Sequence, residues 1–333
     1  MKVLVIPDVH LKPWMFERAD KIMEQGAAEL AVCLMDIPDD WNQEYNLELY
    51  KETFDAAIVF AKKYPETLWT YGNHDLSYIW NEMESGYSPA AAYTVAMKLD
   101  ELAGALPEGN EIRYIQKIDN VLFCHGGLRD YFVKKTVPAE KYHDVDAVVR
   151  IINGLPREYM WSDVSPIWHR PQYTTGKMYG DEKLLQVVGH TPVKKIYREG
   201  NVISCDVFST YRDGRAIGTE EFVVVDTESW EYGGVKAKKN LDIAEIQNTL
   251  LKQMEDYLEG LISKEKYAED AEQFYSKYGY CIEETEFDEV FSEAIPDCCI
   301  VNVDEPGDED LKEKDFHEIM ADTYQKLKGL VDS

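Results

Sequence analysis

Five short apolar runs mark the first 190 residues, and polar residues follow directly after each of them. The runs are Val3–Ile6, Leu30–Met35, Thr67–Tyr71, Val121–Cys124 and Leu184–Val188. Short apolar runs bounded by turn residues are typical of strands that are buried on both faces. The stretches Trp14–Glu29 and Leu47–Tyr64, which separate the first three runs, are helix-like. This alternation of strand and helix predicts an α/β fold with βαβ units.

The pattern of the chain changes near residue 236. Before it, Val202–Cys205 and Phe222–Val225 predict further strands, and the basic patch Lys236–Lys239 follows them. After it, apolar residues recur at helical spacing. We therefore predict an α/β domain over residues 1–235 and a mostly helical extension over residues 241–333. The extension is expected to be a solvated cap on the core; the alternative is a lid, a partner surface or a substrate-selecting element.

The chain is strongly acidic and unevenly so. Its formal net charge is −28, and the residues from 241 onward hold 26 acidic against 8 basic side chains. Binding to nucleic acid needs clustered Lys and Arg, so the charge argues against a nucleic-acid partner. An anionic substrate would have to be attracted locally, by metals and a few basic residues.

Cysteine use and hydropathy indicate a cytoplasmic protein. The six cysteines contain no CxxC pair, and three of them lie in or at the end of apolar runs. Buried, reduced thiols are the expected interpretation, with a metal or redox site at Cys298–Cys299 as the less favoured one. No apolar stretch approaches the roughly 18 residues that span a bilayer, so no membrane partner is expected. The apolar segment at the N-terminus predicts a first strand rather than a signal peptide.

The residues after the apolar runs are of the types that bind hard or borderline cations. The six predicted ligands are Asp8, His10, Asp36, Asn73, His125 and His190. Asp8 and His10 would bind one cation, Asp36 would bridge to a second, and the other three would complete that second site. Such a pair of divalent cations, roughly 3.5–4 Å apart, holds the attacking and leaving oxygens of a displacement and acidifies a bridging water. His74 is the predicted general acid. Asp39 is the first candidate for its carboxylate partner, and Asp75 is the second.

Taken together, these motifs resemble the calcineurin-like metallophosphoesterase superfamily over about residues 1–230. The motifs are Asp8-x-His10, Asp36-Ile-Pro-Asp39, Gly72-Asn-His-Asp75, His125-Gly-Gly127 and Gly189-His190. The resemblance implies a four-layer αββα sandwich of mixed sheets, here with a C-terminal helical appendage. It also implies the ligand set above, with His74 as proton donor paired with Asp39. Pro192, where many members have a metal-binding His, points to the branch of phosphoprotein phosphatases and bacterial dinucleoside tetraphosphate hydrolases.

The chain departs from the family pattern at three further positions. Leu11 and Met35 stand where the family has glycine, and Asp40 stands where the phosphatases have an Arg that binds the substrate phosphate. Another Arg must then bind the phosphate, since a guanidinium matches phosphate oxygens bidentately. The candidates, in order of preference, are Arg170, Arg129, Arg212 and Arg215.

The sequence thus predicts a dinuclear phosphoesterase that hydrolyses phosphomonoesters, in the manner of Ser/Thr protein phosphatases. Hydrolysis of nucleotides such as dinucleoside polyphosphates is the alternative, and a non-catalytic binding protein is a third, less favoured one. The expected substrates are phosphorylated small molecules, nucleotides or phosphoproteins. Mn²⁺ is the preferred metal, with Fe or Zn as alternatives, because mixed oxygen and nitrogen ligands suit all three. The sequence predicts no oligomeric state.

Overall fold

The structure is a computed structural model, and it describes residues 1–174, 176–236, 243–278, 282, 285–304 and 309–331. The chain divides into two compact units, Met1–Lys238 and Lys239–Ser333. The predicted start of the extension, residue 241, lies outside the described residues, as does Cys281. None of the described helices is long and apolar enough to cross a membrane.

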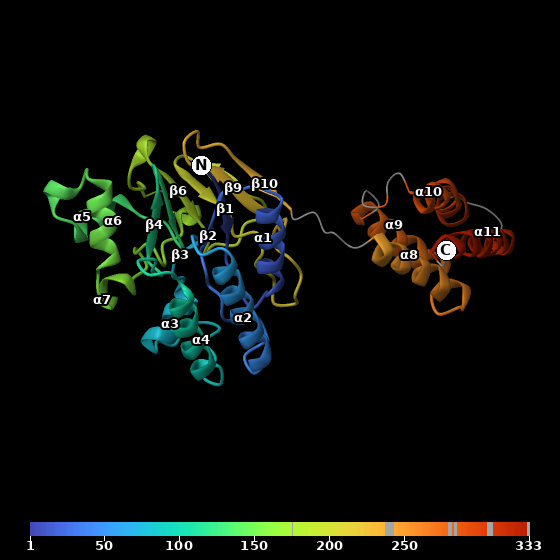
Figure 1. The fold of residues 1–333 in the computed structure, drawn as a ribbon, viewed down its shortest axis with the longest axis horizontal. Coiled ribbons are helices and arrows are strands. Elements are labelled where there is room, and N and C mark those ends of the chain that lie inside the picture. Colours follow the sequence, from blue (N-terminus) through green and yellow to red (C-terminus); the bar gives the residue numbers. More distant parts are fainter. Residues whose placement is uncertain (175, 237–242, 279–281, 283–284, 305–308, 332–333) are drawn as a thin grey trace. The chain divides into compact units, whose positions relative to one another are not determined.

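The first unit contains ten strands and seven α-helices among its described residues (Figure 1). The strands are β1 (Lys2–Ile6), β2 (Leu30–Cys33), β3 (Leu68–Trp69), β4 (Ile115–Ile118), β5 (Val121–Cys124), β6 (Leu185–Val188), β7 (Tyr197–Glu199), β8 (Val202–Ser204), β9 (Phe222–Asp226) and β10 (Tyr232–Val235). The helices are α1 (Trp14–Glu24), α2 (Leu47–Lys63), α3 (Asn73–Trp80), α4 (Ala92–Ala105), α5 (Asp130–Thr136), α6 (Val145–Asn153) and α7 (Arg157–Met160).

The strands form two mixed sheets of five strands each. The first has the order β10-β9-β1-β2-β3, and the second has the order β4-β5-β6-β8-β7. In the first sheet β1 is parallel to β2 and antiparallel to β9; in the second β6 is parallel to both β5 and β8. The carboxyl ends of β1, β2, β5 and β6 carry the predicted ligands Asp8, Asp36, His125 and His190.

The two sheets pack face to face between two layers of helices. Val3 and Val5 of β1 share one apolar cluster with Phe123 of β5 and Val187 of β6, so these side chains lie between the sheets. Leu4, the intervening residue, belongs to a second cluster with residues of α1, α2 and α4, because side chains alternate faces along a strand. A third cluster joins the outer face of β5 to α5 and α6. The predicted four-layer α/β sandwich is therefore confirmed.

The second unit is helical and has an apolar core of its own. Its α-helices are α8 (Ile243–Leu258), α9 (Lys264–Tyr278), α10 (Glu286–Cys299) and α11 (Glu309–Val331). Phe287, Phe291 and Phe316 are almost completely buried in its apolar cluster, whose described residues all belong to this unit. The additional C-terminal helices predicted by the apolar periodicity are therefore present.

Two predicted elements differ from those in the structure. Helix α1 ends at Glu24 rather than Glu29, because Gly26 adopts a positive φ of 68° and the N–H of Ala27 bonds to the carbonyl of Ile22. This is the Schellman arrangement that ends helices at glycine. The third strand covers only Leu68–Trp69 of the predicted run Thr67–Tyr71.

Candidate active site

The loops that follow β1 and β2 run together beyond the carboxyl ends of these parallel strands. Three backbone hydrogen bonds of 2.8–3.0 Å join residues 9–11 to residues 35–37. His10, Leu11, Met35 and Asp36 all have positive φ, between 43° and 56°. Leu11 and Met35 are the positions at which the family resemblance predicts glycine, the residue that tolerates this conformation best. The paired loops therefore place His10 and Asp36 by means of a backbone that ordinary side chains rarely adopt.

Asp75 holds the backbone around Asp36. Its carboxylate accepts hydrogen bonds from the N–H groups of Asp36 (2.9 Å), Ile37 (3.1 Å) and Gly72 (2.9 Å). Gly72 itself packs so tightly that a Cβ there would lie 1.9 Å from Oδ1 of Asp36. With these three bonds, Asp75 braces the loop and has no contact with the His74 ring in the structure, which leaves Asp39 as the partner.

Four potential ligand atoms meet at one point between the two sheets. Nε2 of His125 lies 2.9 Å from Oδ2 of Asp36, 3.0 Å from Oδ1 of Asn73 and 3.2 Å from Nδ1 of His190. Nδ1 of His125 lies 3.1 Å from the carbonyl oxygen of Leu34, which needs a donor, so a proton on Nδ1 leaves Nε2 as the ring nitrogen that would bind a cation. Oδ2 of Asp36, Oδ1 of Asn73 and Nδ1 of His190 thus surround Nε2 of His125. Four oxygen and nitrogen atoms this close together fit a site for one shared cation.

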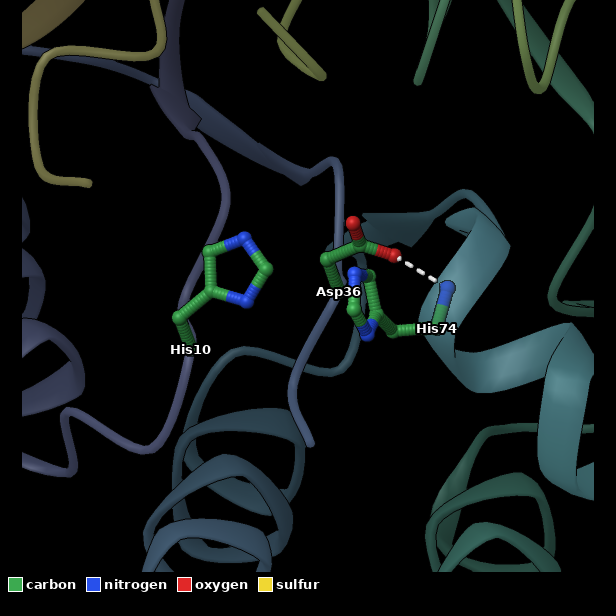
Figure 2. A group of neighbouring side chains, drawn as sticks. All are labelled: His10, Asp36 and His74. Atoms are coloured by element: carbon green, nitrogen blue, oxygen red, sulfur yellow. Dashed lines mark hydrogen bonds between the residues drawn. The ribbon is translucent and has the colours of Figure 1, made fainter. Parts of the chain in front are cut away.

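A second group lies beside the first on the open side of Asp36. His10, Asp36 and His74 each place a ligand atom within 4.8 Å of the others (Figure 2). Nδ1 of His10 faces the carbonyl oxygen of Asp39 at 2.9 Å, so its Nε2 is free to bind a metal. Asp8 Oδ1 accepts the N–H of His190 at 2.7 Å, while its Oδ2 is buried without a hydrogen-bond partner. An orphaned carboxylate oxygen of this kind fits a cation site.

The charges of the buried residues support this interpretation. Burial raises the pKa of Asp8 well above its ordinary value, and the nearby Asp206 adds to the rise. Burial also raises the pKa of Asp36, but the charges of His125 and His74 outweigh it and hold this pKa well below the ordinary range. Burial lowers the pKa of His125, yet Asp36 and Asp8 together raise it to about 9. Buried carboxylates at this density need positive charge close by, which a divalent cation supplies.

His74 is held by carboxylates at both ring nitrogens. Nδ1 lies 2.8 Å from Oδ2 of Asp39, and Nε2 lies 3.1 Å from Oε1 of Glu84. The other oxygen of Asp39 accepts the hydroxyl groups of Tyr50 (2.8 Å) and Tyr78 (2.5 Å). Burial lowers the pKa of His74, but Asp36 and Asp39 outweigh it and raise this pKa to about 10. The backbone N–H of His74 also donates to Oδ1 of Asp36 (Figure 2).

A cavity of about 540 Å³ opens onto the site. The predicted site residues that line it are His10, Asp36, Asp39, Asn73, His74 and His190, whereas Asp8 and His125 do not line it. Of the four candidate arginines, Arg170 and Arg212 line it, and Arg129 and Arg215 do not. Arg129 pairs with Met178 in an isolated bridge, and a Cβ on Gly176 would lie 2.0 Å from its guanidinium, so it packs against another loop. The structure therefore does not support Arg129 as a substrate-binding residue.

The position of the missing Arg is occupied by an ion pair. Asp40 Oδ2 accepts from Nζ of Lys12 at 3.0 Å, and the same ammonium group donates to the carbonyl of His10. Arg170 meanwhile bonds through Nη1 to the carbonyl of His190 at 2.5 Å. Arg170 is thus the candidate that lies directly beside a predicted ligand.

Residues 1–203 match the sequence profile of a family described as calcineurin-like phosphoesterase. The chain belongs to this family. The resemblance predicted from the motifs is therefore confirmed, and with it the prediction of a metal-dependent phosphoric ester hydrolase.

No curated protein matches the chain significantly. Among solved structures, a cold-active protein-tyrosine phosphatase of a psychrophilic Shewanella sp. is 14% identical, with a TM-score of 0.42 over 70% of this chain and 80% of that one. A novel archaeal phosphodiesterase is 17% identical, with a TM-score of 0.33 over 71% and 99%. YfcE, a phosphoesterase from E. coli, is 13% identical, with a TM-score of 0.31 over 71% and 98%.

Asp206 and Glu84 of the phosphoesterase line the cavity although the motifs do not include them. Asp206 is 1% exposed and follows β8, the strand predicted as Val202–Cys205. The sequence therefore marks Asp206 in the same way as the predicted ligands, as a polar residue directly after an apolar run. Glu84 lies on the connection between α3 and α4, where neither an apolar run nor a motif marks it. Only the folded chain brings Glu84 to His74.

Proposed function

We propose that this phosphoesterase hydrolyses phosphomonoesters at two divalent cations, with phosphoserine or phosphothreonine side chains as the leading substrate class. The observation that carries the proposal is the position of His74. Its ring lies on the cavity wall beside the convergent ligand atoms, and Asp39 fixes its orientation. A general acid next to a metal-ligand set is the arrangement that ester hydrolysis requires.

In the proposed site, Asp8, His10 and Asp36 would hold one cation. Asp36, Asn73, His125 and His190 would hold the second. Bound there, the two cations would activate a water molecule and neutralise the phosphoryl oxygens. Mn²⁺ is the proposed metal, because carboxylate, amide and imidazole ligands together suit it.

His74 is proposed to protonate the leaving-group oxygen. The carboxylate of Asp39 keeps the proton on Nδ1 and stabilises the charged ring. The hydroxyl groups of Tyr50 and Tyr78 in turn donate hydrogen bonds to Asp39 and fix its carboxylate in place. Arg170 is proposed to bind the phosphoryl group, since it lines the cavity next to His190.

A nucleotide substrate is the second candidate. The indole of Trp41 lines the cavity and is 54% exposed, yet its Nε1 is fixed by a 3.0 Å hydrogen bond to the carbonyl of Thr210. An exposed aromatic ring held in place offers a stacking surface for a nucleobase.

The five described cysteines are free, and four of them are buried. Free thiols support the proposal of a cytoplasmic location, where reducing conditions maintain them.

The test is a substrate panel assayed after metal removal and reconstitution with Mn²⁺. The panel contains p-nitrophenyl phosphate, its bis-ester, a phosphoserine peptide and diadenosine tetraphosphate. His74→Asn should lower kcat by about 10²- to 10⁴-fold on the best substrate, as expected for a lost general acid. Asn73→Ala should weaken metal binding, and His317→Asn, in the other unit, serves as the control. Wild-type rates in both site variants would refute the assignment, and a preference for the tetraphosphate would favour the nucleotide alternative.

A further inference from the structure

The connection between α3 and α4 places a carboxylate on the catalytic side of His74. Oε1 of Glu84 lies 3.1 Å from Nε2 of His74 and accepts a 2.9 Å hydrogen bond from Nδ2 of Asn73. The Glu84 side chain is only 10% exposed. The bond to Nδ2 also directs the amide oxygen of Asn73 toward His125. One carboxylate oxygen therefore contacts two residues of the proposed mechanism.

The rest of this connection fixes Glu84 in place. The hydroxyl of Tyr78 accepts the N–H of Ser88 at 2.8 Å, and the ring of Tyr87 stacks on Tyr78 at a centroid distance of 4.5 Å. Gly86 has a φ of 94° and passes so close that a Cβ there would lie 3.2 Å from Cε1 of His74. These contacts make the segment part of the cavity wall.

The two nitrogens of His74 have different roles in this geometry. Nδ1 is bonded to Asp39, so Nε2 is the atom that can donate a proton to a leaving group. Glu84 lies at Nε2 and lines the same cavity. A leaving group that reaches Nε2 therefore arrives beside a carboxylate that can only accept hydrogen bonds.

We infer that Glu84 determines specificity by selecting the leaving group. The preferred esters would have a hydrogen-bond donor on the carbon next to the one that bears the scissile oxygen. This donor is a hydroxyl or ammonium group in a small ester and the backbone N–H in a phosphoserine or phosphothreonine residue. The donor bonds to Glu84 while the scissile oxygen takes the proton of His74 Nε2. An aryl or simple alkyl leaving group offers the buried carboxylate of Glu84 no hydrogen-bond donor. Esters with such leaving groups should therefore be hydrolysed with a lower kcat/KM. This inference rests on the phosphomonoesterase proposal.

Three small esters test the inference on the full chain loaded with Mn²⁺. Propyl phosphate lacks a donor, 1,2-propanediol 1-phosphate adds one hydroxyl, and 2-aminoethyl phosphate replaces the terminal methyl with an ammonium group. The wild type should show a kcat/KM at least about tenfold higher for the two donor-bearing esters than for propyl phosphate. Glu84→Ala should bring both ratios close to one; the ratios are compared because the absolute rates also depend on the contacts of Glu84 with Asn73 and His74.

Glu84→Gln separates charge from hydrogen bonding. Its amide oxygen can still accept from Asn73 and from a substrate hydroxyl or ammonium group, so part of the hydroxyl preference should remain while the ammonium preference loses its charge-based part and falls more steeply. Glu82→Gln is the matched control, because Glu82 lies on the same segment, pairs with Arg157 and does not line the cavity. Its ratios should equal those of the wild type. Metal content is measured in every variant, since Glu84 also orients Asn73.

The outcomes distinguish the two proposals. The role of Glu84 would be overturned if the wild type hydrolysed the donor-bearing esters and propyl phosphate with kcat/KM values within twofold of each other. It would also be overturned if Glu84→Ala left the kcat/KM ratios unchanged. In both cases hydrolysis itself would still support the phosphomonoesterase proposal. If the metal-loaded wild type hydrolyses no phosphomonoester, both proposals are wrong. An ammonium preference in Glu84→Gln as large as that of the wild type would also overturn the inference, because a neutral amide gives no charge-based preference.

Discussion

The residues of the site are held by a backbone that is locally strained. Leu11 and Met35 have φ of 54° and 56°, and both side chains are buried. A left-handed conformation costs a non-glycine residue roughly 1–2 kcal/mol. The hydrogen bonds between residues 9–11 and 35–37, together with the burial of both side chains, offset this cost. Leu11 and Met35 therefore keep the backbone conformation that the glycines of the family would favour, although the residues themselves differ.

Gly72→Ala should disrupt the site, since its Cβ would lie 1.9 Å from Oδ1 of Asp36. We expect a loss of about 1–3 kcal/mol in the free energy of unfolding and a large fall in kcat/KM, because Asp36 must move. Gly104→Ala is the control, since a Cβ there meets no atom within 4 Å and the helical position should gain up to about 1 kcal/mol. Urea denaturation and kinetics of both variants measure the difference. Equal behaviour of the two would contradict the close packing at Gly72.

At the scale of elements, the sequence predicts the strands better than it predicts the segments between them. The apolar runs Val3–Ile6 and Val121–Cys124 correspond closely to β1 and β5, because strands buried on both faces leave a continuous apolar signal. The residues after them could therefore be proposed as ligands from sequence alone. Glu84 could not, since it comes to His74 through tertiary packing of an irregular segment. The bracing role of Asp75 likewise depends on three N–H groups that only the folded loops bring together.

Asp75→Ala should be more damaging than the loss of an ordinary helix cap. It leaves three buried N–H groups without their acceptor, so we expect a loss of about 3–5 kcal/mol in unfolding free energy and a strong fall in activity. Asp144→Ala is the control, because Asp144 caps α6 through one N–H and should cost about 1 kcal/mol with no effect on kcat. Chemical denaturation and kinetics of the two variants test this. Similar losses in both would show that Asp75 does not act as a brace.

His169 should make the stability of the segment that follows α7 depend on pH. Burial lowers its pKa to about 4, and the charge of Arg129 contributes. As pH falls below about 6.5, the unfolded chain binds a proton that the folded chain excludes, so stability decreases until about pH 4. Between pH 7 and 5 the wild type should lose about 2 kcal/mol more unfolding free energy than His169→Gln. His143→Gln, a control at another histidine, should follow the wild type, and parallel curves for all three proteins would refute the effect.

At the scale of the whole molecule, the two units differ in charge and have separate cores. Of the net charge of −28, residues from 241 onward carry −18, from 26 acidic and 8 basic side chains. Each apolar cluster draws its described residues from one unit only, and all cavity-lining residues named above belong to the first. The first unit therefore has an apolar core of its own and contains all the described residues of the candidate site.

A chain ending at residue 236 should fold and hydrolyse its substrate. Among the described residues, none beyond 235 belongs to an apolar cluster of the first unit, so its urea midpoint should equal that of the corresponding transition in the full chain. Removal of the acidic residues should also weaken the repulsion of a phosphate dianion. We expect the truncated chain to have a lower KM at low ionic strength, and the difference should disappear at about 0.15 M salt, where charges more than about 8 Å apart are screened. Loss of kcat on truncation would instead mean that the helical unit supplies a group to the site, since the metal ligands themselves would all remain.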